Sequence, residues 1–159
     1  MKIGVVYYSY SGHTAQVVDQ FVADLSASGA DIIKMALEPE GPLQLSAVTV
    51  PLKSQPDISG FDILVLGTPV HGGRMSAPML NFLENVSTLE GKKVAYLLTH
   101  FLPRKWGAVQ TVEVMEGLCW EKGAKILGNA DVAWFGFGRK KKISNAIAKL
   151  KELVAEKSS

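Results

Sequence analysis

The stretch VVYYSYSGHTAQVV, Val5 to Val18, places small and hydroxyl residues abruptly between two apolar patterns. It begins inside a nearly continuous apolar run, Lys2 to Tyr8, of the kind found in strands that are buried on both faces. It ends in a helical pattern, and Gly29 stands where such a helix would stop. The apolar face of that helix holds Val18, Phe21, Val22 and Leu25. The stretch therefore predicts a strand, a turn that carries the hydroxyls, and a helix.

The same alternation of strand and helix continues along the chain. Apolar runs that predict four more strands are Asp31 to Leu37, Asp62 to Thr68, Lys93 to Thr99 and Ala124 to Trp134. Further helices are expected after Ser76 as N-cap, from about Gly107 to Lys122, and along Ile143 to Val154, with residues 156–159 frayed. Strands that alternate with helices indicate a parallel sheet with helices on both faces. We therefore expect an α/β three-layer sandwich around a five-stranded parallel sheet.

The interval from Glu38 to Gly60 interrupts this alternation. It contains four prolines, Pro39, Pro42, Pro51 and Pro56. Because proline inside a helix removes a hydrogen bond and clashes with the preceding turn, a long helix is not expected there. The interval predicts a loop with at most a short helical turn.

The overall composition is that of one globular domain. The chain has 159 residues, of which 47% are hydrophobic and 20% are charged, so we expect a single domain over residues 1–159. No apolar run is long enough to cross a bilayer, and the N-terminus becomes polar too early for a signal peptide. The lone Cys119 cannot form an internal disulfide, and its place on an apolar helix face predicts a core position. A cytoplasmic location is the resulting expectation.

The net charge of +2 gives little reason to expect a polyanion as partner. The only run of like charge is RKKK, Arg139 to Lys142, which we interpret as the solvated entrance of the last helix. We therefore expect neither nucleic acid nor a membrane among the partners.

The first loop at the carboxyl end of the predicted sheet is SYSGHT, Ser9 to Thr14, at the edge where ligands of such sheets bind. It leads into a helix, whose N-terminal amides and dipole favour an anion. The hydroxyls of Ser9, Ser11 and Thr14 can bond to phosphate oxygens, and Gly12 lets the backbone approach. The loop has neither the lysine of a triphosphate loop nor the G-x-G-x-x-G of a dinucleotide loop. It predicts a site for one terminal phosphate; the alternative is an ordinary capped helix.

This loop resembles the phosphate loop of the flavodoxin-like flavoproteins, which reads Ser/Thr-x-Ser/Thr-Gly-x-Thr after a strand that ends in an aromatic residue. Tyr8, Ser9, Ser11, Gly12 and Thr14 fill those places. The resemblance implies the strand order 2-1-3-4-5 and FMN as cofactor. It also implies that the FMN phosphate is held by neutral groups of Ser9, Tyr10, Ser11, Gly12, His13 and Thr14.

The second loop, Gly67 to Leu83, strengthens the resemblance. Many small members of the family have a Gly-Thr-Pro-Val-aromatic segment, then Gly-Arg and a Ser-x-Pro helix start, preceded by a segment like DISGFD, Asp57 to Asp62. The resemblance implies that this loop runs along the isoalloxazine ring and that its contacts come from Thr68, Pro69, Val70, His71, Gly72 and Gly73.

His71 departs from the family pattern, because tryptophan is the commoner residue at its position. It brings a titratable nitrogen and is the candidate catalytic residue, as a proton donor; that it is only a smaller flat contact remains equally open. Gly72 is the candidate for a backbone carbonyl that rotates toward N5 of reduced flavin. Arg74 is placed either near the reduced ring or in solvent.

The third loop, Thr99 to Gln110, resembles the family less. Relatives often have a glycine-rich turn here, whereas this chain has a histidine, a phenylalanine, an arginine and a tryptophan. We carry over only Thr99, His100 and Phe101 as cofactor contacts, because the strand end is the one anchored position.

Other chemistries fit these loops poorly. A receiver domain needs an acidic cluster after the first strand and an aspartate at the end of the third, where this chain has Tyr8 and Thr68. No Gly-x-Ser-x-Gly motif supplies a hydrolase nucleophile. His13, His71 and His100 are expected at one edge, but without cysteine or carboxylate beside them we expect no metal site.

A redox function is therefore expected. Electron-carrying flavodoxins are typically strongly acidic, and this chain is not, which favours an FMN-dependent reductase that takes electrons from NAD(P)H or a partner and passes them to a small acceptor such as a quinone. The alternatives are an electron carrier between redox partner proteins and a flavin-binding module without turnover. Relatives that share a flavin across an interface are dimers, so a homodimer is possible.

Overall fold

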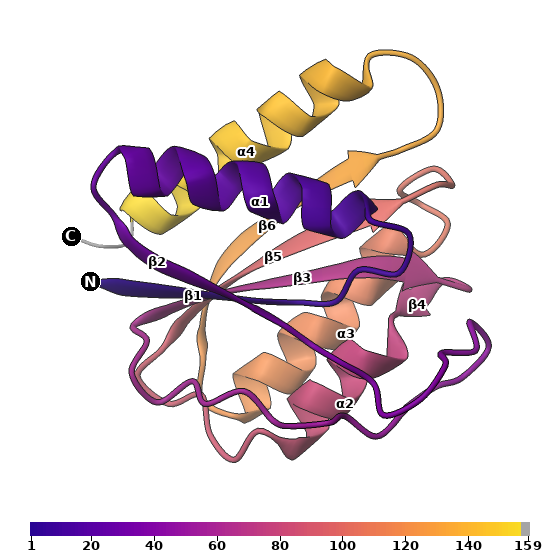
Figure 1. Cartoon of the computed structure of the whole chain (residues 1–159), viewed down its shortest axis with the longest axis horizontal. Coiled ribbons are helices and arrows are strands. Elements are labelled where there is room, and N and C mark those ends of the chain that lie inside the picture. The colour runs from indigo at the N-terminus through magenta and orange to yellow at the C-terminus, as the bar shows by residue number, and fades with distance from the viewer. Residues whose placement is uncertain (157–159) are drawn as a thin grey trace.

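A parallel sheet forms the centre of the computed structural model, which describes residues 1–156 (Figure 1). Its five long strands lie in the order β2-β1-β3-β5-β6. Their bounds are β1 Lys2–Tyr7, β2 Asp31–Ala36, β3 Ile63–His71, β5 Lys93–His100 and β6 Lys125–Ala133. All neighbours in this path pair in parallel. Both the fold class and the predicted order of the long strands are confirmed.

A sixth, short strand was not predicted. β4, Arg74–Met75, pairs antiparallel with the end of β3, where His71 is opposite Arg74. The two residues between them, Gly72 and Gly73, have φ angles of 56° and 80°. A two-residue hairpin turn of this kind requires positive φ at both central positions, which glycine adopts without strain. The glycines of the second loop therefore have a structural reason to be there.

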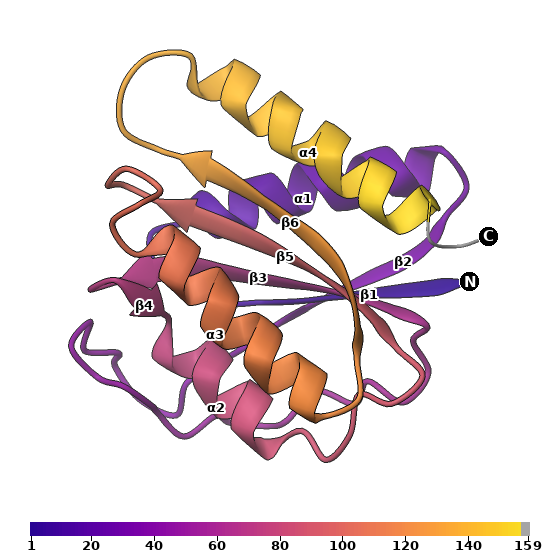
Figure 2. The same cartoon turned by 180° about the vertical axis from the view of Figure 1, so that it is seen from behind.

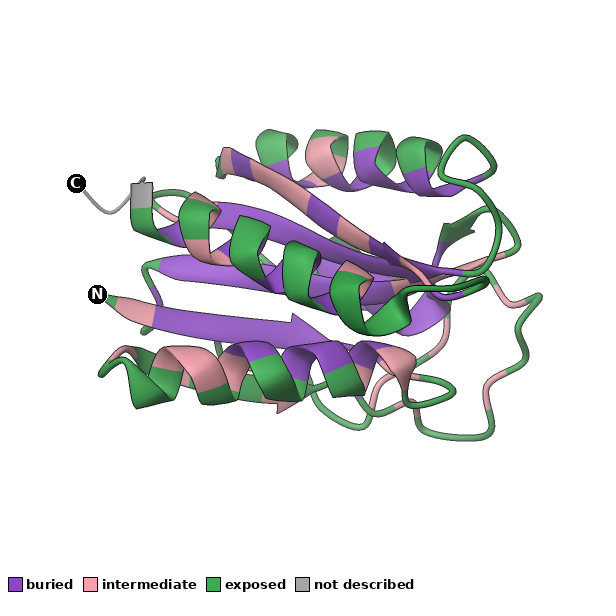
Figure 3. Cartoon of the chain, turned by 90° about the horizontal axis from the view of Figure 1, so that it is seen from above, coloured by how far each residue is buried: buried purple, intermediate pink, exposed green. Residues whose placement is uncertain are grey.

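Two helices cover each face of the sheet (Figures 1 and 2). On one face lie α1, His13–Ala27, and α4, Arg139–Glu156; on the other lie α2, Ala77–Asn85, and α3, Ala108–Glu121. Each face has its own apolar core, and the purple strands in Figure 3 show how completely the helices enclose the central strands. The predicted three-layer arrangement is confirmed. Residues 157–159, part of the end expected to fray, lie outside the described residues.

Local signals in the sequence are mostly confirmed. The interval 38–60 contains no helix, and its one strand pairing is an isolated bridge between Pro39 and Leu52.

Two single-residue predictions are also confirmed. Gly29, with φ 91°, follows the end of α1, and Cys119 is fully buried on α3. Burial raises the pKa of the Cys119 thiol to about 11, so the thiol is un-ionised in the core.

Ser76 occupies the predicted N-cap position of α2, but its hydroxyl does not cap the helix. The Ser76 hydroxyl instead lies 2.9 Å from the Thr68 hydroxyl, and the Ser76 N–H donates to the same Thr68 oxygen at 3.1 Å. Both residues are fully buried. The pair therefore ties the end of β3 to the start of α2.

No helix in residues 1–156 is long and apolar enough to cross a membrane.

Candidate functional site

A pocket of about 180 Å³ lies at the carboxyl edge of the sheet, where the loops after β1, β3 and β5 meet. Its lining comes from all three predicted loops and from one residue of the 38–60 interval: Tyr10, Ser11, His13, Thr14, Leu45, Pro69, Val70, His71, Thr99, His100 and Phe101. Five predicted residues lie beside the pocket without lining it: Ser9, Gly12, Thr68, Gly72 and Gly73. The volume is below the roughly 300 Å³ of a site that encloses a whole small ligand, so the pocket would enclose only part of one.

The first loop offers backbone amides more than hydroxyls. Gly12 is the N-cap of α1 with φ 91° and has no side chain that could cap the helix, and the first turn has no acidic residue. A Cβ on Gly12 would meet nothing within 4 Å, so the space beside this backbone is open. Ser9 lies behind the loop, where its hydroxyl accepts a hydrogen bond from the Ala15 N–H at 3.1 Å. Ser11 is exposed.

Thr14 faces the sheet rather than the loop. It is 1% exposed, and its hydroxyl oxygen lies 2.8 Å from that of Thr99 at the end of β5. One hydroxyl donates to the other, so one proton of the pair remains to be donated elsewhere. Because both residues line the pocket, that proton can be directed toward a ligand.

His71 and Tyr10 close one side of the pocket. Their rings meet edge to face, with centroids 5.6 Å apart and planes at 83°. Desolvation by burial lowers the pKa of His71 below the usual histidine value. The hairpin that turns at Gly72 and Gly73 thus brings this imidazole to the phosphate loop.

His13 belongs to an aromatic stack that the sequence did not reveal. Its ring lies on that of Trp134, with centroids 4.1 Å apart and planes at 13°. The guanidinium of Arg139 lies 4.9 Å from the Trp134 centroid. Desolvation and the nearby Arg139 charge lower the pKa of His13. The only sign of this stack in the sequence was Trp134, the aromatic residue at the end of the last predicted strand.

His100 is buried and is held by a network of polar groups. Its Nε2 lies 2.6 Å from a carboxylate oxygen of Asp131 on β6, and its Nδ1 lies 2.6 Å from the Leu102 carbonyl oxygen. The Arg104 guanidinium lies 2.9 Å from the other Asp131 oxygen. Burial raises the pKa of Asp131, but the hydrogen bond from His100 and the charge of Arg104 outweigh it, so the net shift is downward. Sequence reasoning missed Asp131, although a carboxylate inside an apolar strand signals a buried partner.

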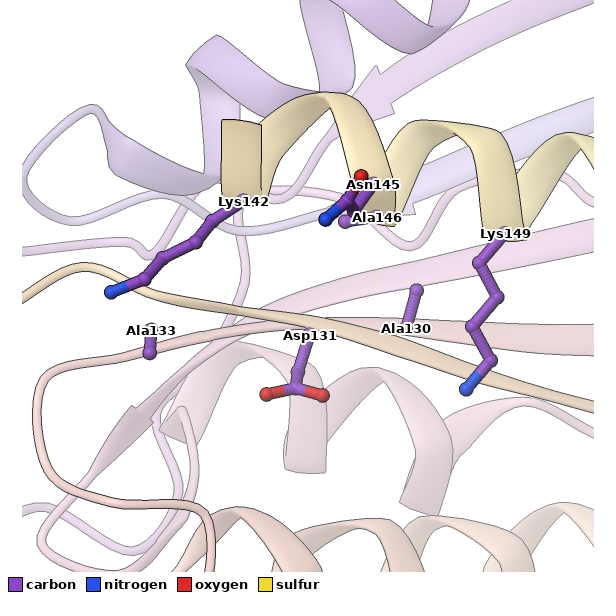
Figure 4. A pocket seen from close by; sticks show the side chains of 7 residues that line it. All are labelled: Ala130, Asp131, Ala133, Lys142, Asn145, Ala146 and Lys149. Atoms are coloured by element: carbon purple, nitrogen blue, oxygen red, sulfur yellow. The ribbon is translucent and has the colours of Figure 1, made fainter. Parts of the chain in front are cut away.

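A second hollow, of about 290 Å³, lies between β6 and α4 (Figure 4). Lys142 and Lys149 extend over it from α4, while the Asp131 carboxylate points away from that helix. Asp131 lines this hollow, but its carboxylate makes its hydrogen bond and ion pair with His100 and Arg104.

All three histidines line the pocket, as expected. Within residues 1–156, however, no three histidine, cysteine, aspartate or glutamate side chains are placed to hold a metal ion.

The profile of the NADPH-dependent FMN reductases matches residues 1–134, which contain all three loops of the pocket. The chain belongs to this family. The family match confirms FMN as the cofactor expected from the first two loops, and the open cradle beside Gly12 at the start of α1 fits its phosphate.

Curated relatives of this FMN reductase family member carry the name NAD(P)H dehydrogenase (quinone). The protein from Cupriavidus metallidurans is 30% identical over 95 residues, covering 55% of this chain and 48% of the relative. That from Methylocella silvestris is 26% identical over 95 residues, with the same coverage. The chain spans about half the length of the curated relatives it matches.

Solved structures of flavodoxins share the fold over nearly the whole chain. A flavodoxin from Streptococcus pneumoniae TIGR4 is 18% identical with a TM-score of 0.71, covering 98% of this chain and 99% of that chain. A flavoprotein in complex with FMN from Lactobacillus acidophilus NCFM is 15% identical with a TM-score of 0.66, covering 91% and 97%. At these identities the likeness establishes the flavodoxin-like fold.

Proposed function

We propose that this protein is an FMN-dependent reductase that takes electrons from NAD(P)H and passes them to a small acceptor such as a quinone. The observation that supports it is the single pocket that combines a helix N-terminus whose N-cap is a glycine, the His71 hairpin and the end of β5. Bound FMN would supply the redox chemistry, because no side chain in the pocket accepts a hydride.

The phosphate of FMN would be held at the start of α1. The N–H groups of the first turn have no intrahelical acceptor, and the helix dipole favours an anion there. The Ala15 N–H donates to Ser9, so the phosphate would take the others. The exposed hydroxyl of Ser11 and the spare proton of the Thr14–Thr99 pair would add neutral donors. Tyr10, Gly12 and His13 would complete the wall of this part of the site, with Ser9 supporting the loop from behind.

The ring system would lie against the second and third loops. Thr68, Val70, Gly72 and Gly73 would contribute backbone amides, with Thr68 fixed to the start of α2. Pro69 has no N–H and would offer only apolar contact and its carbonyl oxygen.

On the other side of the ring, His100 and Phe101 would contribute side chains beside Thr99. We place His71 as the catalytic residue, a proton donor to reduced flavin or to the acceptor, because its imidazole reaches the pocket without a competing carboxylate.

Two observations favour a reductase over an electron carrier. The net charge of +2 differs from the strong acidity of carriers that dock basic partners. The relatives named as quinone dehydrogenases match over 55% of this chain. The carrier remains the second candidate, supported by flavodoxin neighbours that span its whole fold.

The test is anaerobic stopped-flow reduction of the FMN-loaded protein. We expect NADH or NADPH to bleach the flavin absorbance and a soluble benzoquinone to restore it. If neither nicotinamide reduces the flavin, but dithionite-reduced protein transfers electrons to a second redox protein, the carrier is the better description. Protein that fails to quench FMN fluorescence at micromolar concentrations would contradict the whole proposal.

A further inference from the structure

The surface beside the pocket exposes several large apolar side chains, of which only Phe101 lines the pocket. Two segments contribute them: residues 101–106, which follow β5, and residues 135–142, which follow β6 and include the first turn of α4. We call these two segments together the basic aromatic edge. Their exposed fractions are 56% for Phe101, 57% for Trp106, 72% for Phe135 and 100% for Phe137. Scattered exposed residues are ordinary, but a contiguous group marks an interaction surface.

The two loops form one surface. The rings of Phe101 and Phe135 have centroids 6.3 Å apart, and both loops project from the same edge of the sheet (Figures 1 and 2). Phe137 forms the tip of the second loop, between Gly136 and Gly138, whose φ angles are 95° and 76°. The tip therefore places a whole phenylalanine side chain in water.

The charge of this edge is strongly one-sided. Its two segments contain six of the 17 lysines and arginines and none of the 15 carboxylates, so the rest of the chain holds 11 cations and all the carboxylates. Arg104 is compensated by Asp131. Within residues 1–156, none of the other five forms an ion pair with a carboxylate: Lys105, Arg139, Lys140, Lys141 and Lys142.

Most of this positive charge is not neutralised inside the fold. Four consecutive cations occupy the first turn of α4, where the positive end of the helix dipole makes them unfavourable. Arg139 and Lys142 donate to the carbonyl oxygens of Trp134 and Phe135, which fixes their positive heads behind the aromatic tip. Lys140 and Lys141 are exposed. An anionic surface outside the molecule would offset this arrangement.

We propose that the basic aromatic edge binds peripherally to anionic lipid bilayers. Aromatic side chains at loop tips insert at the boundary between headgroups and acyl chains, while lysines and arginines stay beside the lipid phosphates. A second copy of the chain does not fit, because it would bring the same positive edge against itself. An acidic protein fits less well, because four of the six cations are lysines, which are depleted at protein interfaces.

This association differs from the expectation of no membrane partner, which rested on the small net charge and on interpreting Arg139 to Lys142 as a solvated helix entrance. The inference also needs no flavin, so it stands or falls separately from the proposed reductase activity. It would place the pocket mouth at the bilayer surface, because Phe101 belongs both to the pocket lining and to the edge.

The test is flotation of the full chain with vesicles of equimolar phosphatidylglycerol and phosphatidylcholine, compared with pure phosphatidylcholine. We expect binding to the anionic vesicles alone. The double variant K140Q/K141Q should weaken it about fivefold per cation removed, and Phe137→Ser should weaken it by about tenfold. In a Trp120→Phe background, binding should shift the emission to the blue, because Trp106 leaves water while Trp134 is already buried.

Matched controls lie at the opposite edge of the sheet. Trp120, 73% exposed near the end of α3, and Lys125, exposed at the start of β6, offer Trp120→Ser and Lys125→Gln, which should leave vesicle binding unchanged. Thermal melts of each variant establish that it is folded. No flotation with anionic vesicles, or an equal loss in the control variants, would overturn the proposal. So would binding to soluble polyglutamate as tight as to vesicles and insensitive to Phe137→Ser, which would assign the edge to acidic polypeptides.

Discussion

The hydroxyl oxygens of Thr14 and Thr99 lie 2.8 Å apart, and this single hydrogen bond joins the first turn of α1 to the end of β5. Both residues are buried, and both line the pocket. The bond therefore sets the position of the phosphate loop relative to the third loop. Residues 85 positions apart in the chain thus determine the geometry of one site.

Valine substitutions should reveal the strength of this bond, because valine has nearly the shape of threonine. Thr14→Val or Thr99→Val leaves one buried hydroxyl without its partner and should lower the free energy of unfolding by about 1 to 3 kcal/mol. The double variant removes both hydroxyls and should cost clearly less than the sum of the single changes. Urea denaturation of the four proteins measures this coupling. Additive effects would mean that the two hydroxyls act independently.

Ser9 and Ser11 should respond differently to alanine, although the sequence motif treats them alike. The Ser9 hydroxyl accepts the Ala15 N–H, so Ser9→Ala should lower the free energy of unfolding by about 1 kcal/mol. Ser11 is exposed, so Ser11→Ala should leave stability unchanged and raise the Kd for FMN about fivefold. Denaturation and FMN fluorescence titration separate the two roles. A Ser11→Ala protein that binds FMN as tightly as the parent would remove Ser11 from the site.

The fold was largely predictable because its signals are local. Near-continuous apolar runs gave the five long strands, and the prolines of residues 38–60 correctly excluded a second crossover helix. The short strand β4 escaped prediction, because two residues carry no periodic pattern. Its hairpin could have been inferred only from the adjacent glycines Gly72 and Gly73.

The sequence predicted which loops form the site, but it did not predict the side-chain hydrogen bonds within it. A motif identifies hydroxyls, yet which of them turn inward depends on partners far away in the chain. Thr14 pairs with Thr99, and Thr68 pairs with Ser76, so neither hydroxyl is simply directed at a ligand. Asp131 lies 31 positions from His100, and only the register of β5 and β6 brings them together.

His71 should control the pH dependence of the reductase. A proton donor must be protonated, and burial lowers the pKa of His71, so activity should fall with rising pH at a value below that usual for histidine. His71→Phe keeps a flat ring and should lower kcat about 100-fold while abolishing that decline. Steady-state rates across pH, with FMN occupancy measured in parallel, test this. An unchanged profile would leave His71 as a stacking contact only.

Asp131 should make the protein sensitive to acid. The pKa of Asp131 is lower in the folded state than in the unfolded chain. The ionised carboxylate therefore stabilises the fold fully at pH values above its pKa in the unfolded chain, and this stabilisation is lost as the pH falls through its pKa in the folded state. Asp131→Asn should therefore be less stable than the parent at neutral pH, and the difference should narrow below about pH 4. Thermal melts from acidic to neutral pH measure it. Arg104→Gln removes one charge that lowers the pKa of Asp131, so that pKa should rise in the folded protein. In this variant the stabilisation by Asp131 should therefore be smaller and should be fully lost at a higher pH than in the parent.

Two glycines associated with α3 should give opposite results when replaced by alanine. A Cβ on Gly107, where φ is 122°, would lie 2.7 Å from the Gly73 Cα, so Gly107→Ala must separate the second and third loops and should cost about 2 kcal/mol or more. Gly117 lies inside α3 with nothing within 4 Å of such a Cβ, so Gly117→Ala should stabilise the protein by about 0.5 to 1 kcal/mol. Urea denaturation gives both values, and FMN titration of Gly107→Ala should show weaker binding than Gly117→Ala. If Gly107→Ala retains full stability and FMN affinity, the close approach of the two loops does not shape the pocket.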